Sequence, residues 1–201
     1  MEKEAVKSRS ATEQKLVDAV HQLVEERGFE GLGINAVAAS AGVSKMLIYR
    51  YFGSLDGLIA AYIAQYDFWL NFDLKLLKEE DLSDFIKRIL TRQIQLMRDN
   101  YVLRRLYRWE LTAENAMVKE LRQRREEKGT QMVALLSQLL DRPLSEVAFL
   151  ATLLNSSISY LVLFGENCSI YNGIKIGEDV GWRQIEKGIS DLIDMWVLKK
   201  Q

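Results

Sequence analysis

Proline occurs only once in this chain of 201 residues, as Pro143. Because proline disrupts helix interiors more strongly than any other residue, its near absence permits many long helices. Alternating β-branched runs bounded by turn clusters, which would indicate strands, are not found at convincing length. Hydrophobic residues make up 48% of the chain, which is enough to bury a substantial core. We therefore predict an all-α fold.

Apolar residues recur at spacings of three and four along most of the chain, as they do on one face of a helix. Residues 1–10 are polar and of mixed charge, and we expect them to form a frayed arm. One long irregular connection is expected over residues 165–178, where Asn172-Gly173 and Gly177 lie. The expected helices cover residues 11–27, 34–41, 45–52, 55 to the mid-70s, 82–98, 101–112, 114–140, 144–164 and 179–198.

Charge and residue counts exclude several classes of protein. The formal net charge is −1, so the chain does not coat nucleic acid by bulk charge, although local cations can still bind DNA. With Cys168 and His21 as its only cysteine and histidine, it offers no disulfide and no metal cluster. No ordered catalytic triad or phosphate loop is present, so we expect no enzyme and no cofactor. No apolar run reaches a membrane span and no signal peptide is visible, which predicts a cytoplasmic protein.

The most informative segment is INAVAASAGVSKMLIYRYF, residues 34–52. It predicts two short helices joined by a turn that contains Gly42, which is the helix-turn-helix arrangement. Leu47, Ile48 and Phe52 are expected to anchor the second helix to the body of the protein. The outward side chains are then Lys45, Met46, Tyr49 and Arg50. A helix in the major groove reads bases mainly through its N-terminal residues, and cations or a tyrosine hydroxyl can contact DNA.

In this region the sequence resembles the TetR family of bacterial regulators. The resemblance extends over about residues 11–62 and depends on the order of several short elements. These elements are Glu-Arg-Gly-Phe at 26–29, Val37-Ala38, Ala41-Gly42-Val43-Ser44, and Tyr49-Arg50-Tyr51-Phe52 followed by Leu58. The resemblance implies a helix-turn-helix DNA-binding domain, residues 1–54, and a helical ligand-binding and dimerisation domain, residues 55–201. Members of this family are mostly repressors that a small-molecule inducer releases from DNA.

The resemblance also implies which residues contact DNA. Three positions depart from the family pattern. Gly33 replaces a capping threonine or serine, Leu55 replaces a lysine that binds phosphate, and Met46 replaces a commonly small residue. These departures affect the expected affinity and operator sequence but not the mode of binding. The implied DNA-contacting residues are Asn35, Ser44, Lys45, Met46, Tyr49, Arg50 and Tyr51.

The remaining helices carry weaker signals. Aromatic residues at helical spacing usually form core, but the family resemblance implies that some of them line an inducer pocket. The charge run from Arg122 to Lys128 is expected to be a solvated helix face. The last two helices are the candidate homodimer surface, with apolar residues between Val147 and Phe164 and a stripe from Ile185 to Trp196. The candidate pocket residues are Tyr66, Trp69, Phe85, Tyr107, Trp109 and Asn155.

The function predicted from the sequence is a homodimeric repressor that binds a palindromic double-stranded DNA operator and responds to an unknown inducer. One alternative is a helical ligand-binding or interaction module that has lost DNA recognition, which Leu55 and the near-neutral net charge favour. An all-helical enzyme is a second alternative, and the absence of a catalytic arrangement argues against it.

Overall fold

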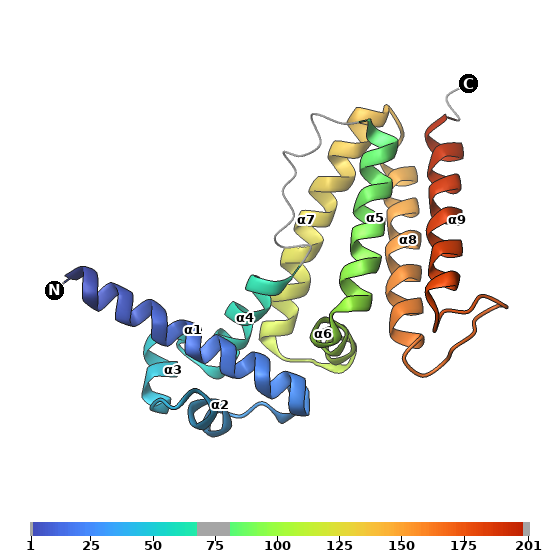
Figure 1. Cartoon of the computed structure of the whole chain (residues 1–201). Helices are drawn as coiled ribbons and strands as arrows, with labels where there is room; N and C mark the ends of the chain where they lie inside the picture. Colours follow the sequence, from blue (N-terminus) through green and yellow to red (C-terminus); the bar gives the residue numbers. More distant parts are fainter. Residues whose placement is uncertain (1, 68–80, 199–201) are drawn as a thin grey trace. The chain divides into compact units, whose positions relative to one another are not determined.

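The structure, a computed structural model, describes residues 2–67 and 81–198. Within these ranges it contains nine α-helices and one short 3-10 helix but no strand, apart from an isolated bridge between Tyr171 and Ile174 (Figure 1). The all-α prediction is confirmed. The elements are α1 (Glu2–Arg27), η1 (Phe29–Gly31), α2 (Ile34–Ala41), α3 (Lys45–Phe52), α4 (Leu55–Tyr66), α5 (Leu82–Asp99), α6 (Tyr101–Thr112), α7 (Ala116–Leu140), α8 (Leu144–Phe164) and α9 (Asp179–Leu198).

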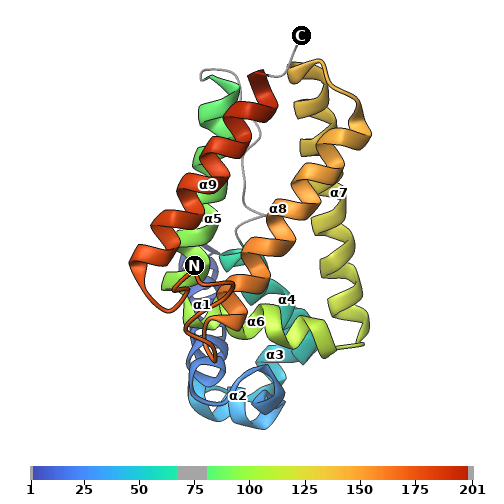
Figure 2. The same ribbon diagram turned by 90° about the vertical axis from the view of Figure 1, so that its right-hand side faces the viewer.

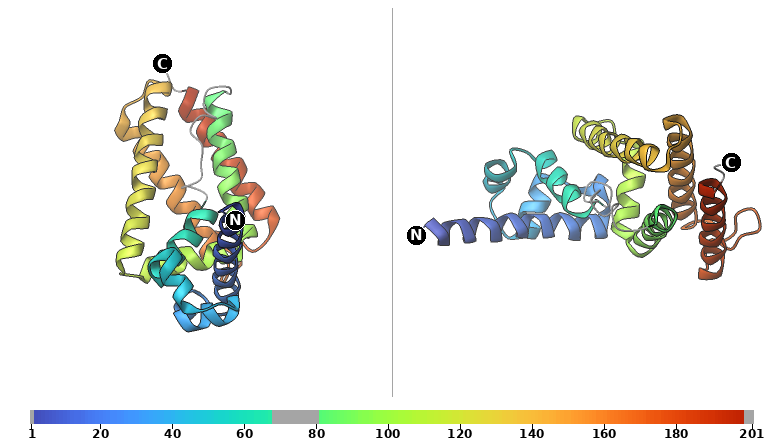
Figure 3. Two further views of the ribbon diagram at one scale, coloured as in Figure 1. Left: turned by 90° about the vertical axis from the view of Figure 1, so that its left-hand side faces the viewer. Right: turned by 90° about the horizontal axis from the view of Figure 1, so that it is seen from above.

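These helices form two compact units. The first contains α1 to α4, α6 and the first part of α7. In it, α1 packs against α2, α4 and α6, and its N-terminal turns extend beyond α2 and α3 (Figure 3). Close packing is possible because the apolar stripe of α1 meets small and branched side chains. The fully buried side chains of this core include Leu16, Val20, Val24, Val37, Ile48 and Leu58.

The second unit contains α5, the remainder of α7, α8 and α9. Helix α5 packs against both α8 and α9. In Figure 2, α8 and α9 lie toward the viewer, with α5 and α7 behind them. Trp182, at the start of α9, is buried and donates from Nε1 to the carbonyl oxygen of Ile176 at 2.8 Å. This bond ties the irregular connection before α9 to the core, whose most deeply buried members are Phe85, Ile94, Met97, Ile158 and Ile193.

Most expected helix bounds agree with the structure to within two residues, but the two ends of the DNA-binding region differ. Helix α1 begins at Glu2, so the prediction of a frayed arm over residues 1–10 was wrong. No proline or glycine interrupts this segment, and Arg9 pairs with Glu13 one turn later at 2.8 Å. Helix α4 ends at Tyr66, with Asp67 as its C-cap, and not in the mid-70s. Trp69 lies outside the described residues.

Helix α8 is long and apolar enough to span a membrane, contrary to the expectation that no segment is. Such a match is weak evidence, because the core helix of a water-soluble protein passes the same test. One face of α8 is buried within the second unit, through Val147, Leu150, Leu154, Ile158 and Val162. Its apolar character is therefore accounted for in part by packing.

Candidate nucleic-acid interface

The turn between α2 and α3 brings two short helices close together. Helix α2 starts after Gly33, an extended residue that makes no side-chain cap hydrogen bond. It ends at Ala41, and its C-cap is Gly42, whose φ of 65° lies in the left-handed region that favours glycine. The N–H of Val43 then donates to the carbonyl oxygen of Ala38 at 3.0 Å. These bonds close the helix end and turn the chain into α3, as the helix-turn-helix pattern predicts.

Helix α3 is capped at one end and anchored along one side. The Ser44 hydroxyl accepts a hydrogen bond from the N–H of Met46 at 3.3 Å, which makes Ser44 the N-cap of α3. Ile48 is fully buried, while Leu47 and Phe52 are half-buried. Because these three side chains occupy one side of a two-turn helix, the other side is left to solvent.

The solvent side of α3 carries the residues that were predicted from the sequence to point outward. Met46 is 66% exposed, and Lys45, Tyr49 and Arg50 are also exposed. Because Met46 is this exposed and lies next to two cations, its side chain has no role in the core of the first unit. Cations and hydrogen-bond donors on one helix face match the phosphates and base edges of a DNA groove.

Tyr51 and Asn35 lie at the edges of this face. Asn35 is exposed in the first turn of α2. The ring of Tyr51 is half-buried and lies near the guanidinium groups of both Arg9 and Arg50, at 5.4 and 5.9 Å. Arg9 was missed in the sequence because the first ten residues were expected to be frayed. As part of α1, it adds a third cation beside α3.

The link from α3 to α4 is tight. The Ser54 hydroxyl caps α4 by accepting from the N–H of Gly57 at 3.0 Å. A Cβ on Gly57 would come within 2.0 Å of the carbonyl oxygen of Phe52, so only glycine fits here. Leu55, which stands where the family pattern has a lysine, is half-buried at the start of α4. The orientation of α3 is therefore fixed by its connections at both ends.

In this all-helical protein, α2 and α3 are joined by a tight turn, and α3 is capped and exposed along one side. This arrangement defines the class of helix-turn-helix proteins. Residues 16–62 match the model of the bacterial regulatory proteins of the tetR family. Uncharacterized HTH-type transcriptional regulators from two strains of Mycobacterium tuberculosis, MT1294 and Rv1255c, are each 30% identical over 92 residues. That alignment covers 44% of this chain and about half, 45%, of each relative.

Solved structures extend the likeness to the whole fold. HlyIIR, a hemolysin II transcriptional regulator, superposes with a TM-score of 0.53 at 18% identity, covering 94% of this chain and 96% of that one. A HlyIIR mutant with residues 169–186 replaced by a linker gives a TM-score of 0.54 at 17% identity, over 78% and 91% of the two chains. The helix-turn-helix segment of this chain is therefore similar to the tetR family of bacterial regulatory proteins, and the described helices share the fold of HlyIIR.

The predicted pocket residues lie in both units. Tyr66, Tyr107 and Trp109 belong to the first unit, while Phe85 and Asn155 belong to the second. Trp109 stacks on Phe29 with ring centroids 4.8 Å apart. Their assignment to a pocket remains a prediction. Among the described residues, no group of three or more His, Cys, Asp or Glu side chains is placed to hold a metal ion.

The aromatic group around Tyr66 also includes His21. Tyr66 is exposed, and its ring centroid lies 5.7 Å from that of His21 and 5.0 Å from that of Tyr62. The Nδ1 atom of His21 lies 3.0 Å from the Tyr62 hydroxyl. Burial raises the pKa of Tyr62, so this phenol stays protonated and can donate. His21 itself is half-buried.

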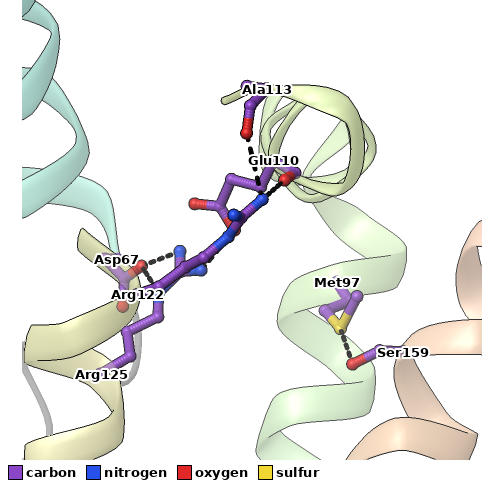
Figure 4. Close-up of polar contacts among 7 residues, drawn as sticks. All are labelled: Asp67, Met97, Glu110, Ala113, Arg122, Arg125 and Ser159. Carbon is purple, nitrogen blue, oxygen red and sulfur yellow. Dashed lines mark hydrogen bonds and ion pairs between the residues drawn. The ribbon is translucent and has the colours of Figure 1, made fainter. Parts of the chain in front are cut away.

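The charge run on α7 differs from its sequence interpretation. Arg125 is not part of a solvated face: its side chain is 15% exposed and lies between two buried carboxylates, Asp67 and Glu110 (Figure 4). Its Nε donates to Asp67 at 2.7 Å, and another guanidinium nitrogen donates to Glu110 at 2.5 Å. Arg122 donates to the backbone carbonyl oxygens of Glu110 and Ala113. The cluster joins α4, α6 and α7 within the first unit.

Burial and charge within the cluster shift the pKa values of Glu110 and Arg125. Burial raises the pKa of Glu110, and the charge of Arg125 only partly opposes this effect. Burial alone would lower the pKa of Arg125, but the two carboxylates raise it above its ordinary value. Arg125 therefore stays charged, and the raised pKa of Glu110 favours the protonated form of this carboxyl as pH falls.

Proposed function

We propose that this chain is a cytoplasmic, homodimeric repressor whose α3 enters the major groove of a palindromic operator. The observation that carries the proposal is the division of α3 into a buried side, centred on Ile48, and an exposed side with Lys45, Met46, Tyr49 and Arg50. A helix anchored in this way presents donors to base edges and phosphates without unfolding any core. Asn35, Ser44 and Tyr51 complete the proposed contact surface.

Exposed apolar side chains on α8 and α9 support a dimer. Phe149 is 68% exposed, although it lies on a helix that contains no charged residue after Glu146. Ile193 is fully buried, so part of the predicted apolar stripe on α9 completes the core of the unit. Pairing with a second copy would bury the remainder and place two reading helices about 34–36 Å apart. The exposed members are Phe149, Leu153 and Tyr160 on α8, and Val180, Leu192 and Met195 on α9.

A dimer provides a way for a ligand to control operator binding. An inducer held by the helical part of the chain lowers operator affinity if it binds more tightly to a state whose two reading helices no longer match the spacing of the groove. The inducer can shift the equilibrium between these two states by no more than the difference in its affinity for them. Of the predicted pocket residues, Phe85 and Asn155 both lie in the second unit and are candidates for its site.

The test begins by selecting duplexes from a random-sequence pool with the intact protein. We expect a palindrome with half-sites one helical turn apart. The double variant Lys45→Ala/Arg50→Ala should lose affinity for this duplex and show a shallower dependence of affinity on salt. A matched control removes the exposed Lys119 and Arg124 of α7, which lowers the net charge equally. Failure to enrich any duplex would favour the alternative, a helical binding module that has lost DNA recognition.

A further inference from the structure

Two amide oxygens in the second unit are buried without a hydrogen-bond partner. One is Oε1 of Gln93 on α5, a residue that is 2% exposed, and the other is Oδ1 of Asn155 on α8. A buried amide that loses water and gains no partner destabilises the folded protein, so such groups are rare. Each of these unpartnered oxygens requires an explanation. Because the two lie on helices that pack together, one explanation can account for both.

The two amides lie at the same level of the α5–α8 interface. Helices α5 and α8 pack against each other and run in the same direction (Figures 1 and 2). The Met97 sulfur and the Ser159 hydroxyl meet at 3.9 Å between these helices (Figure 4). Gln93 and Asn155 each precede one of these residues by four positions, which is about one helical turn. They therefore occupy the next level of the same interface.

Both atoms are acceptors. The Nδ2 group of Asn155 donates to the carbonyl oxygen of Ala151 at 2.8 Å, which fixes its amide orientation and leaves Oδ1 facing away from its own backbone. The flanking residues Ile94 and Ile158 are fully buried and apolar. Helix α8 carries no charge after Glu146, which is more than two turns away. A cation or anion would find no counter-charge on α8 at this level.

We propose that the α5–α8 interface binds a neutral small molecule with two N–H or O–H donors on an apolar frame. The donors satisfy Oε1 of Gln93 and Oδ1 of Asn155, and the frame packs against the surrounding aliphatic side chains. The inference rests on the proposed ligand-responsive function and names the chemical class of its ligand. Phenols with two hydroxyls and aryl ureas have this chemistry.

Binding is tested by ligand-detected NMR on the intact protein with resorcinol and phenylurea. Resorcinol dimethyl ether, which keeps the ring but has no donor, is the matched probe. Resorcinol or phenylurea should bind, with the ether at least about tenfold weaker. Gln93→Met and Asn155→Leu should each weaken resorcinol by about tenfold and leave the ether unchanged. Ser156→Ala, which removes an exposed hydroxyl from the same helix, should change neither.

Thermal unfolding separates a binding role from a structural one. If these amides are kept for a ligand, removing an unpartnered acceptor leaves the melting temperature unchanged or raises it. If they hold the fold together, both variants melt lower. Should Gln93→Met fail to fold, Asn155→Leu carries the same comparison.

Three results would overturn the proposal: no binding of resorcinol or phenylurea, equal binding of resorcinol and its ether, or undiminished resorcinol binding by both variants. Operator affinity, measured separately, distinguishes this failure from that of the proposed function. A probe that binds without changing operator affinity leaves the site standing and removes its regulatory role. Operator binding without any probe binding overturns the proposed ligand site and leaves the proposed DNA-binding function standing.

Discussion

Two groups of basic side chains in the first unit show how environment decides the role of a residue. On α3, Lys45 and Arg50 are exposed beside Met46 and Tyr49. On α7, Arg125 is enclosed by the carboxylates of Asp67 and Glu110. An exposed cation keeps its hydration and is available to a phosphate, whereas an enclosed one is committed to the partners that compensate for its lost hydration. The first group should therefore govern DNA affinity, and the second should govern stability.

The largest effect is expected for Arg125→Met. Removing this cation leaves two buried carboxylates uncompensated, which should lower the free energy of unfolding by roughly 3–5 kcal/mol. Urea denaturation measures the loss. The control is Arg124→Met, because Arg124 pairs with Glu120 on the surface and should change stability by less than about 1 kcal/mol. Equal effects of the two substitutions would contradict the contrast between buried and exposed cations.

The cost of Arg125→Met should also depend on pH. Burial already raises the pKa of Glu110, and loss of the neighbouring cation raises it further. The folded variant therefore takes up protons more readily than its unfolded chain as pH falls below neutral. The difference in stability between variant and wild type should shrink in that direction. A difference that stays constant from neutral to mildly acidic pH would exclude the carboxylates as its cause.

A smaller effect, on a different quantity, is expected for each exposed cation of α3. Lys45→Ala or Arg50→Ala should weaken binding to the selected duplex by about 1–3 kcal/mol, with little change in unfolding. Fluorescence anisotropy at several salt concentrations, together with urea denaturation, measures both quantities. If either substitution destabilised the protein as much as Arg125→Met does, the exposed position of these residues would be in doubt.

Arg9→Ala tests whether the exposed group extends to α1. Arg9 lies near the Tyr51 ring, and its loss should reduce the salt slope of DNA binding by about one. Glu13→Ala removes only its ion-pair partner and should leave that slope unchanged. An unchanged slope in Arg9→Ala would restrict the proposed DNA-contacting surface to α2 and α3.

The smallest effect is expected for the cap of α3. Ser44→Ala removes the hydroxyl that accepts from the N–H of Met46, and should lower stability by about 1 kcal/mol. Ser54→Ala, at the cap of α4, is its matched control, because it removes a similar bond away from the proposed DNA surface. Both variants should lose similar stability, but only Ser44→Ala should also lose DNA affinity.

Local rules were enough to predict most of the helices and the exposed side of α3. Periodic apolar residues, the near absence of proline, Gly42 and the Ser44 cap act over a few residues, so their effects can be inferred from spacing alone. The same rules predicted that Lys45 and Arg50 point outward while Ile48 anchors α3. They failed for residues 1–10, where polar composition suggested a frayed arm and the segment forms the start of α1.

Only the tertiary structure decided the roles of residues that depend on distant partners. Arg125 looked like one charge in a solvated run until α4 and α6 brought Asp67 and Glu110 to it from 58 and 15 positions away. Gln93 carried no prediction and Asn155 was one of six candidate pocket residues, and only packing showed that both amide oxygens are buried. Helical periodicity reports which side of a helix is apolar, but burial and charge compensation depend on what packs against it.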